Sequence, residues 1–423
     1  MNFACVWNMK LKTIFFNLIL FFLLFINGSQ VLAQSQPQDN IPDGAVPIEF
    51  IGNHIYVKTV TDGVPGTLIF DTGAYNLSLD SLYYQNHVFP YFDLVKYRVG
   101  GAGDAMVTID IIRDIVHFSV ADTSFITRLV PIYSLKPSLG DYVDGMIGLK
   151  FFLNEVLEVN YEKEYYKTYA SISEKFKDFE AAKKNGWSKI HLIKQDKKIL
   201  IPVEVCVNDS IYFTKNFVLD LGSGNQVSIN SPIAVEYDLV NNIEDQLVFY
   251  SNHDGIGGGA VSYTFNGASI KIGDYKINDV PMSYSKNKSG GLSVTDWAGL
   301  LGNGIYSKFN ICLDFNNLDL YIQPNSSFKK PYDRYKLGFA PLYRSQTLKA
   351  WVVRGLFKDS NAEKAGLQID DRIVKINGED IIKLSYKEAR GYFDDINHLD
   401  LDIIRAGEPM KISFDLEPML KVK

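Results

Sequence analysis

The chain has 423 residues, of which 46% are hydrophobic and 22% are charged, as in globular proteins with sizeable cores. This length suffices for two or three domains. The formal net charge of −6 argues against nucleic acid or an anionic membrane as the main partner. The 25 tyrosines and 27 phenylalanines suit β-strands and a peptide-binding cleft.

The N-terminus has the pattern of a secretory signal peptide. Lys10 and Lys12 precede the apolar run 14–26, and Val31-Leu32-Ala33 offers small residues where a signal peptidase reads them. We expect cleavage before Gln34, a secreted or periplasmic mature protein, and no stable membrane insertion after cleavage. If the signal is not cleaved, the chain is an anchored protein, although the run is short for a membrane span.

Strand patterns begin after a polar leader. The segments 49–51 and 55–60 alternate and are rich in β-branched residues, 62–66 is predicted to be a turn, and 67–70 is a strand that leads to Asp71.

Two further features lie between and within the later strands. The charged segment 171–185 has helical spacing and predicts one surface helix with a solvated face. Cys206 and Cys312 lie in apolar strand-like runs, where we favour two buried free thiols over a disulfide.

A short motif occurs twice. Leu68–Ala74 (LIFDTGA) returns as Phe217–Ser223 (FVLDLGS), so that two apolar strands each end in Asp-X-Gly, 149 positions apart (220 − 71). Each copy is followed by a glycine-rich turn, an apolar pair flanked by glycines, and a late strand. The distance from the aspartate to the last glycine of the apolar pair is 77 residues in the first copy (148 − 71) and 82 in the second (302 − 220). This matched order indicates a duplication.

Paired aspartates from duplicated halves predict one active site with a shared proton, because two like charges held close together cannot both ionise. The glycine two residues after each aspartate permits a sharp turn whose backbone N–H groups hold the carboxylate. The ionised aspartate would activate a water molecule, and the protonated one would support the developing oxyanion. The six histidines are scattered without ligand spacing, and G-x-S-x-G and P-loop motifs are missing, so we expect neither a metal nor a cofactor.

These motifs resemble the aspartic proteases of the pepsin and retroviral-protease clan over residues 48 to 323. Asp71-Thr72-Gly73-Ala74 is similar to the signature of that clan in its retroviral-like form. The resemblance implies a mainly β, bilobal acid-protease fold with one lobe for each repeat, and an aspartic endopeptidase that acts on protein or peptide substrates. The implied catalytic residues are Asp71 and Asp220, and the implied supporting residues are Thr72, Gly73, Ala74, Leu221, Gly222 and Ser223. Flap hairpins over the substrate are implied at Tyr97, Gly100, Gly101, Gly103, Gly257 and Gly258.

The two Asp-X-Gly motifs differ from each other at two positions, and one of them departs from the usual pattern of the clan. Leu221 stands where the clan usually has a threonine whose hydroxyl ties the elbows together, so Thr72 is expected to lose its symmetric partner. The alternative is therefore a catalytically degenerate peptide-binding or sensing protein that acts through its C-terminal domain. Ser223 offers a hydroxyl where Ala74 does not, so we expect Asp220 to ionise more readily than Asp71.

The C-terminal segment resembles a PDZ domain of the type found in bacterial periplasmic proteases. The match is most specific from Asn361–Leu367 to Ile376-Asn377-Gly378. Leu337, Gly338 and Phe339 resemble the loop whose N–H groups bind the C-terminal carboxylate of a peptide. Such an α+β domain adds an extended peptide to the edge of its sheet, and could deliver substrate tails to the cleft or regulate access to it.

The predicted domain organisation follows from these boundaries: signal peptide 1–33, leader 34–47, first protease lobe 48–170, inter-lobe helix and linker 171–190, second lobe 191–325, linker 326–334 and PDZ domain 335–423.

Overall fold

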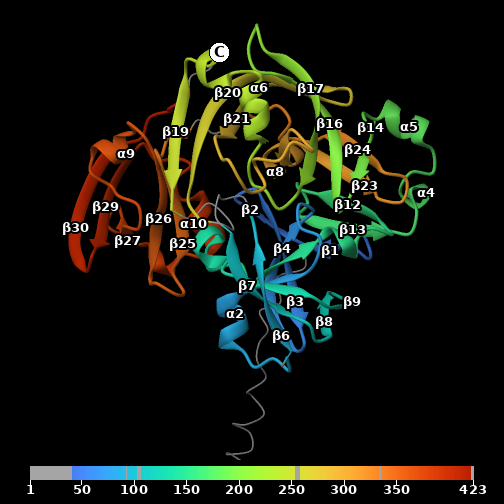
Figure 1. Ribbon diagram of the computed structural model, residues 1–423, viewed down its shortest axis with the longest axis horizontal. Helices are drawn as coiled ribbons and strands as arrows, with labels where there is room; N and C mark the ends of the chain where they lie inside the picture. The colour runs from blue at the N-terminus through green and yellow to red at the C-terminus, as the bar shows by residue number, and fades with distance from the viewer. Residues whose placement is uncertain (1–40, 92, 102–105, 253–257, 333–334, 421–423) are drawn as a thin grey trace, which may run out of the picture. The chain divides into compact units, whose positions relative to one another are not determined.

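The computed structural model describes residues 41–420 except 92, 102–105, 253–257 and 333–334. The expected signal peptide and the leader as far as Asn40 lie outside the described residues. The elements below all lie in one compact unit, residues 43–423. It is mainly β, and the longest α-helices in the described part have six residues (Figure 1). None of the helices described is long and apolar enough to span a membrane.

The described strands form three sheets of six, ten and fourteen strands. The ten-stranded sheet belongs to the first half of the chain and runs in the order β6-β7-β10-β5-β11-β4-β3-β8-β9, with β2 on β3. Its strands are β2 (Glu49–Ile51), β3 (His54–Thr61), β4 (Val64–Asp71), β5 (Ser78–Asp80), β6 (Leu94–Val99), β7 (Val107–Ile112), β8 (Val116–Val120), β9 (Thr123–Thr127), β10 (Val130–Tyr133) and β11 (Gly145–Gly148). Its helices are α2 (Ser81–Asn86), α3 (Lys136–Leu139) and the 3₁₀ turn η1 (Leu149–Phe151).

Local chemistry explains two boundaries in this half. Asp62 and Gly63 have φ values of 43° and 86°, as a two-residue hairpin turn requires, so β4 begins at Val64 and the turn is shorter than the predicted 62–66. Asp80 begins α2 because its side chain accepts hydrogen bonds from the backbone N–H groups of Leu82 and Tyr83.

The six-stranded sheet joins the two halves. Strands β12 and β23 pair antiparallel, with Leu157 opposite Leu313, so the two predicted late strands are direct neighbours. The strands are β1 (Val46–Pro47), β12 (Val156–Asn160), β13 (Tyr165–Tyr169), β14 (Ser188–His191), β23 (Phe309–Asp314) and β24 (Asp319–Pro324). Because of this sheet, the apolar cores of the two halves form one continuous cluster.

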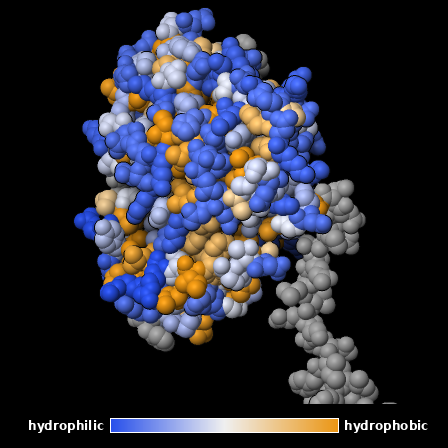
Figure 2. All heavy atoms as spheres, turned by 90° about the vertical axis from the view of Figure 1, so that its right-hand side faces the viewer, coloured by the Kyte–Doolittle hydropathy of each residue, from blue (hydrophilic) through white to orange (hydrophobic). Residues whose placement is uncertain are grey.

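The single helix predicted for 171–185 is wrong in extent. Two short helices, α4 (Ile172–Lys175) and α5 (Phe179–Lys184), flank Phe176. The Phe176 ring packs 4.9 Å from that of Trp187 and 5.3 Å from that of Tyr321, which takes this residue out of a continuous helix. The side of the molecule that carries these helices is mostly hydrophilic with scattered apolar patches, in agreement with a solvated face (Figure 2).

The fourteen-stranded sheet begins in the second half and continues into the C-terminal segment. The second-half strands are β15 (Ile193–Gln195), β16 (Lys198–Cys206), β17 (Tyr212–Asp220), β18 (Val227–Ile229), β19 (Gln246–Ser251), β20 (Ala260–Ile272), β21 (Tyr275–Ser285) and β22 (Gly299–Gly302), with helices α6 (Ser231–Glu236), α7 (Leu239–Asn242) and α8 (Asn303–Tyr306). The thiols of Cys206 and Cys312 are free, as favoured from the sequence.

The C-terminal segment has its own apolar core, which extends from Phe339 to Leu416. Its elements are β25 (Phe339–Arg344), β26 (Ala350–Phe357), α9 (Asn361–Lys364), β27 (Arg372–Ile376), β28 (Glu379–Asp380), the 3₁₀ turn η2 (Ile381–Lys383), α10 (Tyr386–Gly391), β29 (His398–Arg405) and β30 (Glu408–Asp415). Strand β19 pairs with β26, with Tyr250 opposite Leu356, so the orange and red C-terminal strands extend the second-half sheet (Figure 1).

Candidate active site

The two Asp-X-Gly motifs have the same structural setting. Strand β4 pairs parallel with β11, which places Asp71 opposite Gly148, and β17 pairs parallel with β22, which places Asp220 opposite Gly302. Each of these glycine strands also pairs antiparallel with a short strand that follows the motif, β5 or β18. The repeat seen in the sequence is therefore a repeat of strand pairing.

Backbone N–H groups hold both carboxylates. The N–H of Ala74 donates to Asp71 Oδ1 at 2.8 Å. The N–H groups of Gly222 and Ser223 donate to Asp220 Oδ1 at 2.9 and 3.1 Å. The predicted elbows thus orient their carboxylates through the turn that follows each aspartate.

The two elbows face each other, and the glycines make this approach possible. A β-carbon at Gly73 would lie 2.7 Å from Asp220 Cγ, and one at Gly222 would lie 2.4 Å from Asp71 Cγ. Neither separation is tolerated between carbon atoms, so any larger residue would push the opposing carboxylate away. The side chains of Asp71 and Asp220 are hydrogen-bonded to each other.

Thr72 ties the elbows together from one side. Its Oγ1 donates to the carbonyl of Leu219 at 2.8 Å and accepts from the N–H of Leu221 at 2.9 Å. Leu221 is fully buried and has no hydroxyl with which to return the bond. The Asn303 side chain donates to the Leu221 carbonyl and supports this turn. Leu221 does not provide the symmetric partner of Thr72, as expected from the sequence, but Thr72 still joins the first elbow to the backbone of the second by two hydrogen bonds.

The environment of the pair favours one shared proton. Burial raises the pKa of Asp71, and hydrogen bonds from its own elbow oppose this. Burial and then the charge of Asp71 raise the pKa of Asp220 to about 7. The charge of Asp71 raises the pKa of Asp220, which favours Asp71 as the ionised member, whereas the sequence predicted that Asp220 ionises first. Ser223 contributes its backbone N–H to Asp220, while its Oγ accepts a hydrogen bond from the N–H of Asn225 at 3.4 Å.

Sequence reasoning missed Lys198, a cation beside the pair. It begins β16, and its ammonium group donates to the carbonyl of Gly73. Its charge lowers the pKa of both Asp71 and Asp220, against the effect of burial. No motif marks this lysine, because the fold alone brings it to the first elbow.

The glycine-rich segments predicted as flaps lie at hairpin ends. Strands β6 and β7 form one hairpin, and Gly100 and Gly101 follow β6. Strands β19 and β20 form the other, and Gly258 precedes β20. Gly103 and Gly257 lie outside the described residues. Tyr97 is 61% exposed on β6 and does not line the cavity at the aspartates.

A cavity of about 580 Å³ contains Asp71 and Asp220. Gly101 lines it from the first hairpin, and the carbonyl of Gly101 accepts a hydrogen bond from the N–H of Gly291 in the second half at 2.8 Å. A volume of this size is in the range of ligand-binding pockets. Within the described part of the chain, no three His, Cys, Asp or Glu side chains gather as they would around a metal ion.

The predicted carboxylate-binding loop borders the same cavity. Leu337 and Phe339 line it, and Gly338 between them has a φ of 70°, which favours glycine. A β-carbon at Gly338 would also lie 2.7 Å from Ser360 Cβ, so the loop requires glycine on two grounds.

Comparison with known proteins assigns the C-terminal segment. A search of curated proteins found no match to the chain. Residues 352–398 match the family model of the PDZ domain. This match starts within β26, includes α9, β27 and α10, and ends where β29 begins. The chain thus contains a PDZ domain, a module that binds peptides and protein C-termini.

Proposed function

We propose that the chain is an aspartic endopeptidase of the pepsin and retropepsin type, in which Asp71 and Asp220 activate water for attack on a peptide bond. The observation that carries the proposal is the contact between two carboxylates from equivalent strand ends, each against the glycine of the opposite elbow. The repeated strand pairing around the two elbows supports a bilobal pepsin-like fold for residues 48–325.

The chemistry follows from the shared proton. Asp71 is the ionised member and accepts a proton from water as the water oxygen attacks the carbonyl carbon. Asp220, whose pKa is raised to about 7, keeps its proton and donates a hydrogen bond to the developing oxyanion. When the C–N bond breaks, Asp71 gives the proton that it accepted from water to the leaving nitrogen and is ionised again. No metal or cofactor takes part in these steps.

The PDZ domain provides peptide recognition beside this site. The expected signal peptide supports action outside the cytoplasm, in a secreted or periplasmic location. Detection of a mature N-terminus at Gln34 in protein recovered from the producing cells would test that location. An unprocessed N-terminus would contradict it.

One observation favours the second candidate, a peptide-binding protein without hydrolytic activity. Lys198 lowers the pKa of both aspartates and thus opposes retention of the proton that the mechanism requires. Cleavage separates the candidates: the mature chain is incubated with a reduced, unfolded protein from pH 4 to 8, beside Asp71→Asn and Asp220→Asn. The proposal predicts cleavage by the wild type alone. No cleavage by folded wild-type protein at any pH would leave the peptide-binding candidate.

A further inference from the structure

The carboxylate pair and the PDZ domain share one cavity. The cavity that contains Asp71 and Asp220 is also lined by Leu337 and Phe339 at the start of β25, and by Tyr386 and Arg390 on α10. Tyr386 and Arg390 are four positions apart and so lie on one face of the helix. A peptide held between β25 and α10 is therefore already in the space that holds the two aspartates.

Most of the β25 edge is closed to a long peptide. The carbonyl of Gly338 accepts a hydrogen bond from the N–H of Phe357 in β26. Because backbone groups alternate in direction along a strand, the N–H and C=O groups of the next residue, Phe339, point away from β26. At the other end, the carbonyl of Tyr343 accepts from the N–H of Asp141 at 2.9 Å, so this edge group is already occupied. The backbone groups of Pro341, two residues before Tyr343, point to the same free edge, but proline has no N–H with which to bond a peptide.

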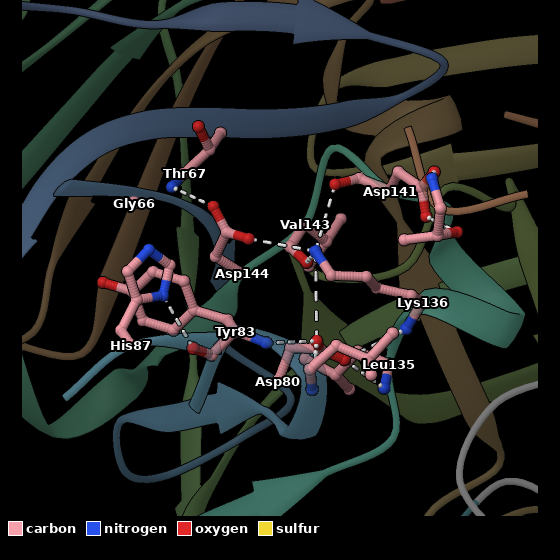
Figure 3. A network of polar contacts seen from close by, with 12 residues as sticks. Gly66, Thr67, Asp80, Tyr83, His87, Leu135, Lys136, Asp141, Val143 and Asp144 are labelled. Carbon is pink, nitrogen blue, oxygen red and sulfur yellow. Dashed lines mark hydrogen bonds and ion pairs between the residues drawn. The ribbon is translucent and has the colours of Figure 1, made fainter. Parts of the chain in front are cut away.

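The segment that blocks the far end of β25 is firmly held. The Nζ of Lys136 donates to the carbonyls of Asp141 and Val143 at 3.1 and 2.8 Å and to Asp144 Oδ1 at 3.0 Å (Figure 3). Asp141 in turn accepts from Arg344 Nε at 2.9 Å, and the Asp141 side chain is fully buried in this ion pair. A peptide that displaced Asp141 would separate the buried charge of Arg344 from its carboxylate partner, which is unfavourable.

A peptide that adds antiparallel to β25 has its C-terminus at the Leu337–Phe339 loop, where the strand begins. It can follow the edge only as far as Pro341 before Tyr343 and Asp141 stop it. Pro341 lines the same cavity as Asp71 and Asp220, so the upstream part of the peptide can enter the space at the aspartates.

The charges in the cavity suit this direction. Arg354 of β26 and Arg390 of α10 both line this cavity, and the guanidinium of Arg390 lies against Gly52, just before β3. Burial, and then the charge of Arg390, lower the pKa of His54 to about 4, so this side chain is neutral at neutral pH and leaves the cation role to the arginines. The two arginines favour a peptide carboxylate in the cavity that also holds the carboxylate pair.

We propose that one substrate chain occupies both sites: its free C-terminal carboxylate binds at the Leu337–Phe339 loop, in the cavity that Arg390 also lines, and the bond a few residues upstream is cleaved at Asp71 and Asp220. The inference rests on the proposed function and narrows its substrates to unstructured protein tails and peptides with a free C-terminus. Hydrolysis adds one water across the C–N bond, and leaves a shortened chain with a new carboxylate and a short peptide with a new amine.

The test uses the full mature chain and two peptides of one sequence, one with a free C-terminal acid and one with a C-terminal amide. We expect the amide to lower kcat/KM at least tenfold. The cleaved bond, located by mass spectrometry, should move along the sequence when residues are appended at the C-terminus. Equal kcat/KM values for acid and amide, or a cleaved bond that stays fixed, would overturn the inference while leaving the proposed function intact.

Variants separate the carboxylate contact from general damage. Arg390→Gln should lower kcat/KM for the acid more than for the amide, so that the ratio of the two values falls toward one. Arg372→Gln, at an exposed position of β27, is the matched control and should change neither. If Arg390→Gln lowers kcat/KM for the acid and for the amide by the same factor, the proposed contact between Arg390 and the peptide carboxylate is refuted. If the wild type cleaves neither these peptides nor an unfolded protein, the proposed function itself fails, and this inference with it.

Discussion

Replacing Asp220 by asparagine should reduce the loss of unfolding free energy that the wild type shows as the pH rises from 4 to 8. The pKa of Asp220 rises from an ordinary value of 3.8 to about 7 in the folded chain. The unfolded chain therefore releases this proton as pH rises through 3.8, whereas the folded chain keeps it until about pH 7. Stability contributed by the proton is present below pH 3.8 and is lost progressively between these two values.

The magnitude follows from the same shift. At about 1.4 kcal/mol for each pKa unit, a rise from 3.8 to about 7 costs the wild type roughly 4 kcal/mol of unfolding free energy above pH 7. Asparagine does not titrate, so Asp220→Asn lacks this cost. The difference in unfolding free energy, variant minus wild type, should increase by up to this amount between pH 4 and pH 8.

Urea unfolding followed by tryptophan fluorescence at the two pH values measures this difference. Asp122→Asn, at an exposed turn, is the control and should show a difference that does not depend on pH. A difference for Asp220→Asn that stays constant, or decreases, from pH 4 to pH 8 would refute the assignment of a raised pKa to this carboxyl.

Three further predictions concern the elbows and their cation. Thr72→Val removes two buried hydrogen bonds between the elbows and should lower stability by roughly 2 kcal/mol in urea unfolding, while Thr72→Ser should restore most of it; equal losses would contradict the hydrogen-bond role. Gly222→Ala places a methyl group 2.4 Å from the opposing carboxyl carbon and should lower the cleavage rate about a hundredfold or more, whereas Gly391→Ala, with its nearest neighbour at 3.8 Å, should not. Lys198→Gln removes a charge that lowers the pKa of both carboxylates, so the alkaline limb of the pH–rate profile should move to higher pH, and Lys197→Gln should leave it in place. A shift to lower pH would contradict this sign.

Local patterns were sufficient to predict much of the candidate site. The strands before Asp71 and Asp220 are short apolar runs ending in Asp-X-Gly, and both the run and the turn are determined by adjacent residues. The order of the repeat was visible in the sequence, and the structure adds that these strands pair with Gly145–Gly148 and Gly299–Gly302.

What escaped prediction depends on contacts between distant residues. Lys198 reaches the carbonyl of Gly73 across 125 positions of sequence, and no local signal marks it. The helix predicted for 171–185 is interrupted because Phe176 packs on Tyr321, which lies in another part of the chain. The predicted order of ionisation was argued from the Ser223 hydroxyl, and in the folded structure this hydroxyl accepts a hydrogen bond from the N–H of Asn225.

The PDZ module was recognisable from its own sequence, but its placement was not. The ion pair between Arg344 and Asp141 joins residues 203 positions apart and fixes β25 against the first half of the chain. Residues of the C-terminal segment, among them Phe339 and Arg390, therefore line the same cavity as the two aspartates, which no local motif predicts.

The central claim is that Asp71 and Asp220 act as one catalytic unit. The most direct test compares the rate of cleavage of an unfolded protein by Asp71→Asn, Asp220→Asn and the double variant with that of the wild type, at the optimal pH of the wild type. Two groups that share one proton depend on each other for catalysis. We therefore predict that each single variant cleaves at least about a thousandfold more slowly than the wild type, and that the double variant is no slower than either. Losses that multiply in the double variant, or a single variant that retains the wild-type rate, would contradict the account.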